Sequence, residues 1–264
     1  MTKELFNLDK LNILLWDIET LPYISMHWGM WKQNINPGQI IKDVSIICIS
    51  YKWLGEEETH TLSIGDNPAL FAEDPYAGAG AVVDKFLDVL DVADFCIAHN
   101  GDKFDYRILK ATAVMNDLRT FRVRKVDTLK MAKSAGMFPE GNKLDSLAKV
   151  LGIEQKYKTN FGMWSDIALK SSTEALDKME RYCEQDVRVL EQVFLRLWPH
   201  AEVGLPNIST MFGGTIDDIE CDKCGSDNVV KNGTYMKNVL RYQRFRCQSC
   251  GASFVGRRAI KLEV

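Results

Sequence analysis

Two carboxylates near the N-terminus have the spacing needed to share one site. Asp17 and Glu19 stand two residues apart at the end of 12–17, an apolar run that predicts a short buried strand. In an extended chain, residues two apart point to the same side, so both carboxylates face one pocket. By itself an Asp-x-Glu pair after a strand is usually a helix cap or a solvated turn, so the interpretation depends on further acidic residues.

Two more acidic residues occur on expected helices. Asp105 opens a helix after a strand and the pair His99-Asn100, and Asp186 follows Tyr182 by four residues. That spacing places Tyr182 and Asp186 on one helix face, ~6 Å apart along the axis. Each has a simpler explanation when taken alone. An acid in a first turn is favoured by the helix dipole, and a Tyr-Asp pair is usually a coincidence of amphipathic pattern.

Together, the carboxylates predict a metal site that hydrolyses phosphodiesters. Clustered carboxylates repel one another and lose solvation, and a hard cation such as Mg²⁺ or Mn²⁺, which prefers oxygen ligands, neutralises them. Two such ions about 4 Å apart suit phosphodiester hydrolysis, because one activates the attacking water and both stabilise the leaving oxygen. We therefore expect two Mg²⁺ or Mn²⁺ ions as catalytic cofactors.

Four of the seven cysteines predict a second, structural metal site. They form two C-x-x-C pairs with 22 residues between them: Cys221, Cys224, Cys247 and Cys250. Each pair precedes a glycine, which we expect to let backbone N–H groups turn toward the thiolates. Four thiolates suit one tetrahedral zinc ion with Zn–S distances of about 2.3 Å. The remaining cysteines have apolar neighbours and are expected to be small buried side chains: Cys48, Cys96 and Cys183.

The acidic residues, in this order and context, resemble the three exonuclease motifs of the DEDD superfamily. The matching segments are Asp17-x-Glu19, His99-Asn100-x-x-x-Phe104-Asp105 and Tyr182-x-x-x-Asp186. The tyrosine is similar to that of the DEDDy branch, which includes the proofreading domains of family B DNA polymerases. A histidine five residues before the last aspartate would mark the other branch, and Arg181 stands there. The resemblance covers about residues 10–200, and 126–128 and 143–148 also look like family segments.

This resemblance implies a fold, an activity and a set of roles. The fold is α/β, with a ribonuclease H-like mixed β-sheet flanked by helices, and the activity is 3′-5′ exonuclease with two divalent metals. The implied metal ligands are Asp17, Glu19, Asp105 and Asp186. Tyr182 would orient or help to activate the nucleophilic water. Three more residues would support the site or contact the terminal nucleotides: Thr20, Asn100 and Phe104.

The cysteine segment looks like a zinc ribbon, and 244–254 is similar to ribbons attached to transposases and other DNA-acting proteins. Residues 221–264 hold nine basic and three acidic residues, whereas 1–220 hold 24 basic and 33 acidic ones. A basic tail on an acidic body predicts contact with nucleic acid. The expected contacts are Arg241, Arg244, Arg257 and Arg258. A solvated basic surface and docking of a protein, such as a replication or repair protein, are the alternatives.

Hydrophobic periodicity and turn residues predict an α/β layer fold and three parts of the chain. We expect an exonuclease domain at 1–203, a linker at 204–219 and the ribbon at 220–264. The expected strands of the body are 12–17, 45–53, 59–64, 94–98 and 122–127, with a hairpin across 55–58. The expected helices are 81–90, 104–115, 127–135, 144–151 and 173–197. In the ribbon, 229–230 and 241–246 are the expected strands.

Two segments rich in aromatic residues have no place in this scheme. Residues 22–43 are expected to be irregular and contain Tyr23, Trp28 and Trp31 beside His27 and two methionines, Met26 and Met30. They would form either a stacking platform for single-stranded bases or a packed satellite cluster under a loop. The same two readings apply to 156–164.

Composition narrows the class of protein. Of 264 residues, 46% are hydrophobic and 26% charged, which excludes collagen-like, disordered and low-complexity chains. The sequence has no apolar run long enough to span a membrane and no signal peptide pattern, so a cytoplasmic location is expected. The expected substrate is single-stranded or 3′-ended DNA. Two alternatives stay open: an RNA-trimming 3′-5′ exoribonuclease, and a non-catalytic zinc-ribbon adaptor for nucleic acid.

Overall fold

A computed structural model describes residues 11–153, 159–201, 219–237 and 239–260. The centre of the body is a five-stranded sheet with the order β5-β4-β1-β6-β7. Its strands are β1 (Ile13–Leu21), β4 (Ser45–Trp53), β5 (His60–Ser63), β6 (Phe95–Ala98) and β7 (Lys125–Asp127). Strand β1 pairs antiparallel with β4 and parallel with β6. The expected mixed sheet and the expected β4–β5 hairpin are therefore confirmed.

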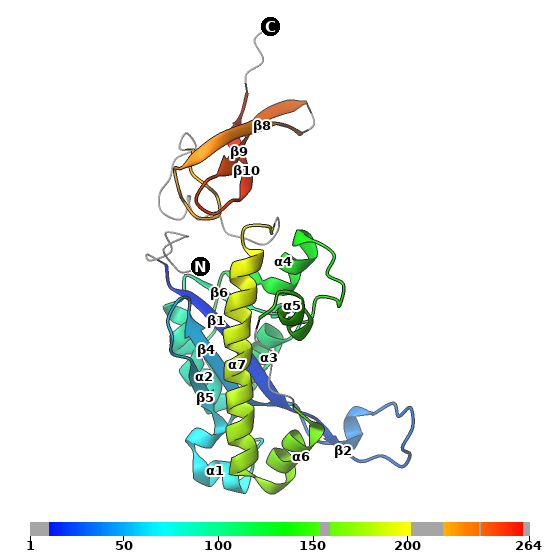
Figure 1. Cartoon of the computed structure of the whole chain (residues 1–264). Coiled ribbons are helices and arrows are strands. Elements are labelled where there is room, and N and C mark those ends of the chain that lie inside the picture. The colour runs from blue at the N-terminus through cyan, green and yellow to red at the C-terminus, as the bar shows by residue number, and fades with distance from the viewer. Residues whose placement is uncertain (1–10, 154–158, 202–218, 238, 261–264) are drawn as a thin grey trace.

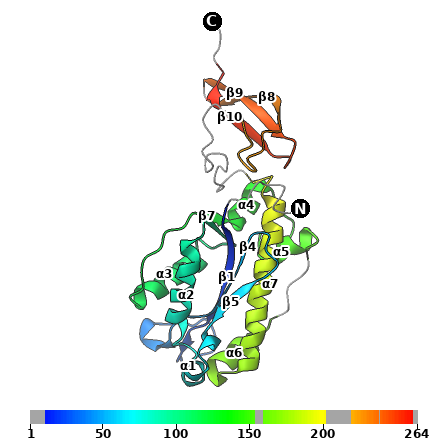
Figure 2. The ribbon, with the colours of Figure 1, turned by 90° about the vertical axis from the view of Figure 1, so that its left-hand side faces the viewer.

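Helices cover both faces of this sheet (Figures 1 and 2). In Figure 2, α2 and α3 lie on one side of the sheet and α7 lies on the other. The helices are α1 (Pro68–Glu73), α2 (Ala79–Asp91), α3 (Asp105–Met115), α4 (Thr128–Ala135), α5 (Leu144–Val150), α6 (Phe161–Lys170) and α7 (Thr173–Leu197). Among the described residues, no helix is both long enough and apolar enough to cross a membrane.

The side chains of β1 alternate between two apolar clusters, and this alternation sets the position of its acidic residues. Ile13 and Leu15 belong to the cluster that contains the C-terminal half of α7. Leu14 and Trp16 belong to the cluster that contains α2 and α3. Because side chains two apart share a face, the row of Ile13 and Leu15 continues into the carboxylates that follow them on β1.

A buried ion pair fixes the long helix α7 to the sheet. The ammonium of Lys52, on β4, lies 2.6 Å from a carboxylate oxygen of Glu191 on α7. The other oxygen of Glu191 accepts a hydrogen bond of 2.7 Å from the backbone N–H of Gly55, in the β4–β5 turn. Both partners of the pair are largely buried, so α7 is held against the hairpin by charge as well as by apolar packing.

Residues 22–43 form an extension that we call the arm. They were expected to be irregular, but they contain a small antiparallel sheet of β2 (Ile24–Ser25) and β3 (Ile40–Lys42) and a 3₁₀ turn, η3 (Pro37–Gln39). Strands this short depend on their hydrogen-bonded partner rather than on their own composition, so periodicity does not reveal them. Figure 1 shows the arm, in blue, projecting from the body beyond the end of β1.

The C-terminal part is a three-stranded antiparallel sheet with the order β10-β9-β8. Its strands are β8 (Val229–Lys237), β9 (Leu240–Cys247) and β10 (Ser253–Ala259). The segments 229–230 and 241–246 are indeed strands, β8 extends well beyond its expected end, and β10 was not expected. Almost all of the expected linker, 204–218, lies outside the described residues, so the domain boundaries stay a prediction.

Several shorter elements differ from expectation. The strand expected at 122–127 is confined to β7, and helices α1 and α6 were not expected. Part of 156–164 lies outside the described residues, and the rest begins α6. On that helix, Met163 and Trp164 pack against an apolar cluster, whereas Phe161 is exposed.

Candidate metal and nucleic-acid sites

Three of the four expected acidic residues meet at one point. Carboxylate oxygens of Asp17, Glu19 and Asp186 all lie within 4.8 Å of one another. The first two come from β1 and the third comes from α7, which crosses the same face of the sheet. Asp186 is buried and the other two are half-buried, so part of the group is accessible to solvent. Its oxygen atoms are the type of ligand that Mg²⁺ and Mn²⁺ prefer.

The strand is irregular directly beside this group. The pairing of β1 with β4 shifts register between Glu19 and Thr20, which is a β-bulge or a similar irregularity. Bulges commonly occur next to active sites, where they redirect a side chain. Thr20 follows the shift and is half-buried, so its position is compatible with the expected role near the substrate.

Asp105 lies beside the group of three but is not part of it. Its side chain is only 2% exposed, and burial raises its pKa to about 7. Hydrogen bonds from the backbone N–H groups of Asp105 and Ile18 limit this rise. Ile18 stands between Asp17 and Glu19 on β1, so Asp105 is held against the strand that carries them. Its Oδ1 atom is buried and has no hydrogen-bond partner among the described residues.

The turn before Asp105 is organised by Asp127, to which the sequence pattern gave no role. Asn100 has a φ of 63°, in the left-handed region. Its backbone N–H donates a hydrogen bond of 2.9 Å to Oδ1 of Asp127. The same oxygen accepts the N–H of Leu129 at 2.9 Å and so caps α4. An Asp directly before a helical run is a cap signal in the sequence, but its second partner becomes visible only in three dimensions.

Tyr182 and Cys183 lie on α7 next to the acidic group. Tyr182 is half-buried, one helical turn before Asp186, as expected. The thiol of Cys183 lies 3.6 Å from the main-chain oxygen of Asp17, to which it donates. Burial raises the pKa of this thiol well above its usual value. Cys48 and Cys96 are also fully buried, so all three isolated cysteines are the small apolar side chains that were expected.

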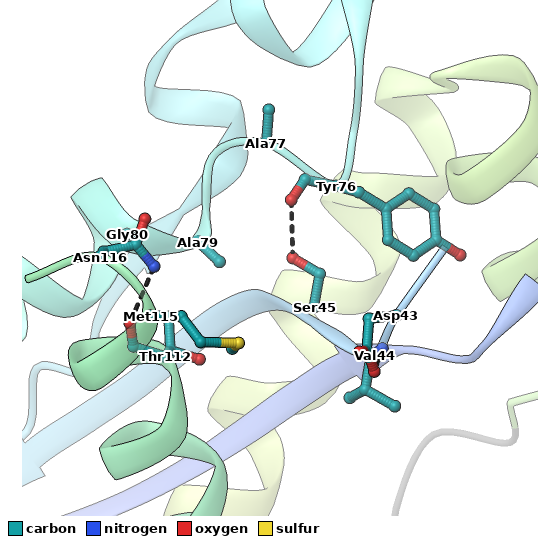
Figure 3. Close-up of a pocket in the computed structure, with 10 residues that line it drawn as sticks. All are labelled: Asp43, Val44, Ser45, Tyr76, Ala77, Ala79, Gly80, Thr112, Met115 and Asn116. Carbon is teal, nitrogen blue, oxygen red and sulfur yellow. Dashed lines mark hydrogen bonds between the residues drawn. The ribbon is translucent and has the colours of Figure 1, made fainter. Parts of the chain in front are cut away.

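One further expected contact is exposed, and one cavity of the body has none of the acidic site residues in its wall. Phe104 precedes α3 and is 44% exposed. A cavity of about 270 Å³ lies between the base of the arm and the ends of α2 and α3 (Figure 3). Its wall includes Ser45, which donates a hydrogen bond of 3.0 Å to the main-chain oxygen of Tyr76. None of the four acidic site residues lines this cavity.

The four C-terminal cysteines form a compact buried cluster. Their sulfur atoms all lie within 4.8 Å of one another. The Cys221–Cys250 and Cys224–Cys247 sulfur pairs are each 3.6 Å apart. A tetrahedral zinc ion with Zn–S distances of about 2.3 Å requires sulfur atoms ~3.8 Å apart. The donor set and its spacing therefore fit one zinc ion.

The two C-x-x-C turns repeat the same backbone pattern. Gly225 donates its N–H to Cys221 O at 2.8 Å, and Gly251 donates to Cys247 O at 3.2 Å. Both glycines have a φ near 70–77°, a conformation that favours glycine. Backbone N–H groups do point at sulfur, as expected, among them those of Lys223 and Cys250. The glycines close the turns, and other residues contact the thiols.

The cysteine cluster packs directly against the end of α7. Trp198 follows that helix and is fully buried, and its indole Nε1 donates a hydrogen bond of 2.9 Å to Lys223 O. The ammonium of Lys223 in turn donates to Ala201 O at 2.9 Å. All four cysteines belong to the same apolar cluster as Phe194 and Trp198. The C-terminal end of α7, the helix that carries Asp186, therefore packs against the ribbon.

The basic residues of the ribbon divide between faces of its sheet. On the regular central strand β9, Arg244 and Arg246 alternate with the buried Phe245 and are exposed. Tyr242 lies on the same face, and Arg241 lies on the opposite one. The pairing of β10 shifts register between Val255 and Ala259, around Arg257 and Arg258. The expected set of four arginines is therefore not one continuous row.

Comparison with known proteins agrees with this architecture. The sequence matches the RNase_H superfamily over residues 42–198 and the InsA N-terminal domain, a zinc ribbon, over 217–251. The chain belongs to the RNase_H superfamily. The ribonuclease H-like fold with a C-terminal zinc ribbon, expected from the motifs, is confirmed. The matched range of the first family includes Asp105, Tyr182 and Asp186, and begins after Asp17 and Glu19.

One solved structure shows the same fold at low identity. It is the family B DNA polymerase from the hyperthermophilic archaeon Pyrobaculum calidifontis, with 15% sequence identity and a TM-score of 0.50. The match covers 72% of this chain and 25% of the polymerase, so the chain corresponds to about a quarter of that protein. No curated protein matches the sequence.

Proposed function

We propose that this chain is a metal-dependent 3′-5′ exonuclease that hydrolyses phosphodiester bonds at the 3′ end of nucleic acid, with DNA as the expected substrate. The observation that supports it most directly is the convergence of Asp17, Glu19 and Asp186 within 4.8 Å. Carboxylates this close repel one another, and a divalent cation would relieve that repulsion. The membership of the RNase_H superfamily and the fold shared with a DNA polymerase point to the same chemistry.

The residues of this site have distinct proposed roles. Asp17, Glu19, Asp105 and Asp186 would hold two Mg²⁺ or Mn²⁺ ions, which supply an activated water and stabilise the leaving oxygen. The buried Oδ1 of Asp105, which has no hydrogen-bond partner among the described residues, is suited to this because a cation would satisfy it. Tyr182 would orient the attacking water. Thr20, Asn100 and Phe104 would contact or frame the terminal nucleotides.

The ribbon would add affinity for the substrate. We propose that Cys221, Cys224, Cys247 and Cys250 hold one structural zinc ion. Arg244 and Arg246 lie side by side with Tyr242 on the exposed face of β9, where guanidinium groups can reach phosphates and a ring can stack on a base. The proposed division of the chain stays as expected: exonuclease domain 1–203, linker 204–219 and ribbon 220–264.

The test is digestion of end-labelled oligonucleotides of matched sequence, as single- and double-stranded DNA and RNA, with Mg²⁺, Mn²⁺ or EDTA. We expect stepwise release of nucleotides from the 3′ end of DNA, abolished by EDTA. Asp17→Asn and Asp186→Asn should lower the rate by about 10³-fold or more, since each removes several kcal/mol of metal-dependent stabilisation.

Glu57→Gln is the matched control, because it neutralises an exposed acid in the β4–β5 turn. It should digest DNA at the wild-type rate. Faster digestion of RNA than of DNA would identify an exoribonuclease instead. Binding of nucleic acid without metal-dependent cleavage in the wild-type protein would identify an adaptor and overturn the proposal.

A further inference from the structure

The arm presents an unusual concentration of large apolar side chains to solvent. Trp28 is 104% exposed, Met30 83% and Trp31 81%. Four further apolar side chains of the arm are also exposed: Tyr23, Met26, Ile35 and Ile41. The structure therefore does not bury them in a packed satellite cluster. Large apolar patches on the surface of a protein commonly mark a binding site.

The arm is nevertheless an ordered element. Met26 and Gln39 are joined by two hydrogen bonds: Met26 N–H donates to Gln39 O at 2.9 Å, and Gln39 Nε2 donates to Met26 O at 3.1 Å. At its base, Tyr76 Oη donates to Pro22 O at 2.9 Å, and Lys42 pairs with Asp74 at 2.5 Å. Contacts at both ends thus fix the arm to the body. A ligand would therefore bind to side chains carried by a backbone that is already folded.

The charge of the arm is opposite in character to that of the body. Residues 22–43 contain two lysines and one aspartate, a net charge of +1, whereas residues 1–220 hold 33 acidic and 24 basic residues. A polyanion is repelled by the body as a whole and is not repelled here. Aromatic side chains combined with lysine and amide groups are the composition of sequence-tolerant platforms for unpaired bases.

The arm is also continuous with the carboxylate site. It joins β1, which carries Asp17 and Glu19, to β4, and the two strands pair up to Leu21 and Ser45. Ile24, the first residue of β2, follows Glu19 by five residues, so their backbones are at most ~18 Å apart. A strand whose 3′ end reaches the carboxylates is therefore close to the base of the arm, and Trp28, nine residues after Glu19, is at most ~32 Å from it along the backbone.

We propose that the arm binds the unpaired 3′ segment of the nucleic-acid substrate by stacking its bases on Trp28 and Trp31. This inference rests on the proposed exonuclease function, and it specifies the form of the substrate. The protein would prefer single-stranded or frayed 3′ ends over blunt duplex. It would bind them with little dependence on base sequence, because every base has a face that can stack.

The experiment is fluorescence anisotropy with labelled single-stranded DNA and blunt duplex DNA in Ca²⁺, which limits cleavage. The double variant Trp28→Leu/Trp31→Leu keeps apolar surface but removes the aromatic faces. It should weaken single-strand binding by about five-fold to a hundred-fold for each lost stack. Trp28→Phe/Trp31→Phe should retain most of the affinity. The control is Val92→Ala/Met137→Ala, which removes two exposed apolar side chains outside the arm and should bind as the wild type does.

Equal affinity of the Leu variant and the wild type for single-stranded DNA would overturn the proposal. So would a wild-type dimer, seen by light scattering, that the Leu variant converts to monomer, because the arm would then cover a second copy. Equal loss of binding to duplex and single strand would also count against it. These outcomes are read from binding alone, so they are separate from failure of the exonuclease proposal, which is absence of metal-dependent cleavage by the wild-type protein.

Discussion

The indole of Trp198 donates a hydrogen bond to the main-chain oxygen of Lys223, and this bond joins the end of α7 to the first C-x-x-C turn. The ring also packs on Phe194 with centroids 5.0 Å apart. Both atoms of the bond are buried, so water cannot replace either partner. The body and the ribbon therefore share part of one core, although they match two different families.

Trp198→Phe should keep the ring contact with Phe194 but leave Lys223 O without its donor. A buried unsatisfied acceptor costs about 1–3 kcal/mol, so we expect the free energy of unfolding to fall by that amount. Urea unfolding followed by circular dichroism, with zinc present, measures it. The control is Trp31→Phe, an exposed side chain for which a change within about 0.5 kcal/mol is expected. Equal stability of both variants would mean that the bond does not couple the two parts.

Removal of zinc should have effects beyond the ribbon. We expect one zinc ion per chain in protein purified under reducing conditions, and loss of ribbon structure on chelation, since metal binding supplies most of the folding energy of such modules. Because the cysteines share a cluster with Phe194 and Trp198, chelation should also lower the melting temperature of the body. Cys224→Ser should reproduce this, and Cys96→Ala should still bind zinc. Zinc-free protein with wild-type structure would contradict the assignment.

Tyr182→Phe should separate chemistry from binding. Loss of a group that positions the attacking water is worth about 10²-fold or more in turnover. Affinity for single-stranded DNA in Ca²⁺ should stay within about two-fold, because the ring is retained. Tyr51→Phe on β4 is the comparison, since the residue next to it, Ser50, pairs with Asp17 and so Tyr51 faces the other side of the sheet. Wild-type turnover in Tyr182→Phe would reduce Tyr182 to a packing role.

The face of the ribbon that carries Arg244 and Arg246 should account for its salt-dependent affinity. Each lost phosphate contact flattens the slope of log affinity against log salt by about 0.7 on single strands and about 0.9 on duplex DNA. We expect Arg244→Gln/Arg246→Gln to lower the slope by about 1.5. The control is Lys231→Gln/Arg241→Gln, which removes the same charge from the opposite face, because Lys231 pairs with Phe245. If both pairs change the slope equally, the ribbon attracts nucleic acid by net charge alone. If neither does, docking of a protein becomes the better interpretation of the ribbon.

The buried ion pair of Lys52 and Glu191 should contribute more to the stability of the body than an exposed ion pair does. Glu191→Ala leaves an ammonium buried without its partner, which costs about 3–5 kcal/mol. Glu174→Ala removes an exposed pair with Lys178 on the same helix and should change the stability much less, because solvent screens the pair. Urea unfolding compares them. Replacing both buried partners by apolar residues, Lys52→Met/Glu191→Leu, should restore much of the loss.

How much the sequence revealed depended on how local each feature is. The bounds of α7 match expectation residue for residue, because Ser172 caps its start, Pro199 follows its end and a strong amphipathic pattern lies between them. The side-by-side carboxylates of Asp17 and Glu19 followed from strand geometry alone. The burial of Asp105 against Ile18 did not, because it depends on how α3 packs beside β1.

Other features are absent from the sequence pattern because they are made by pairing or packing. Strands β2, β3 and β10 are held by their partners and have little periodicity of their own. The contact of Trp198 with Lys223 joins segments on either side of the expected linker, and no local rule connects them. The division of the ribbon arginines between two faces also required the register of β9 to be known.

The register of β1 and β4 makes the arm an insertion in the connection between two paired strands. Leu21 and Ser45 are directly paired at the point where the arm leaves the sheet and returns to it. Two strands that meet this way can be closed by a two-residue turn such as Asn-Gly. In topological terms the arm is an insertion in a hairpin. A change in its length leaves the order of the strands in the sheet unaltered. Selection could therefore change the length of the arm separately from the carboxylate site, and a designer could transplant it into another hairpin.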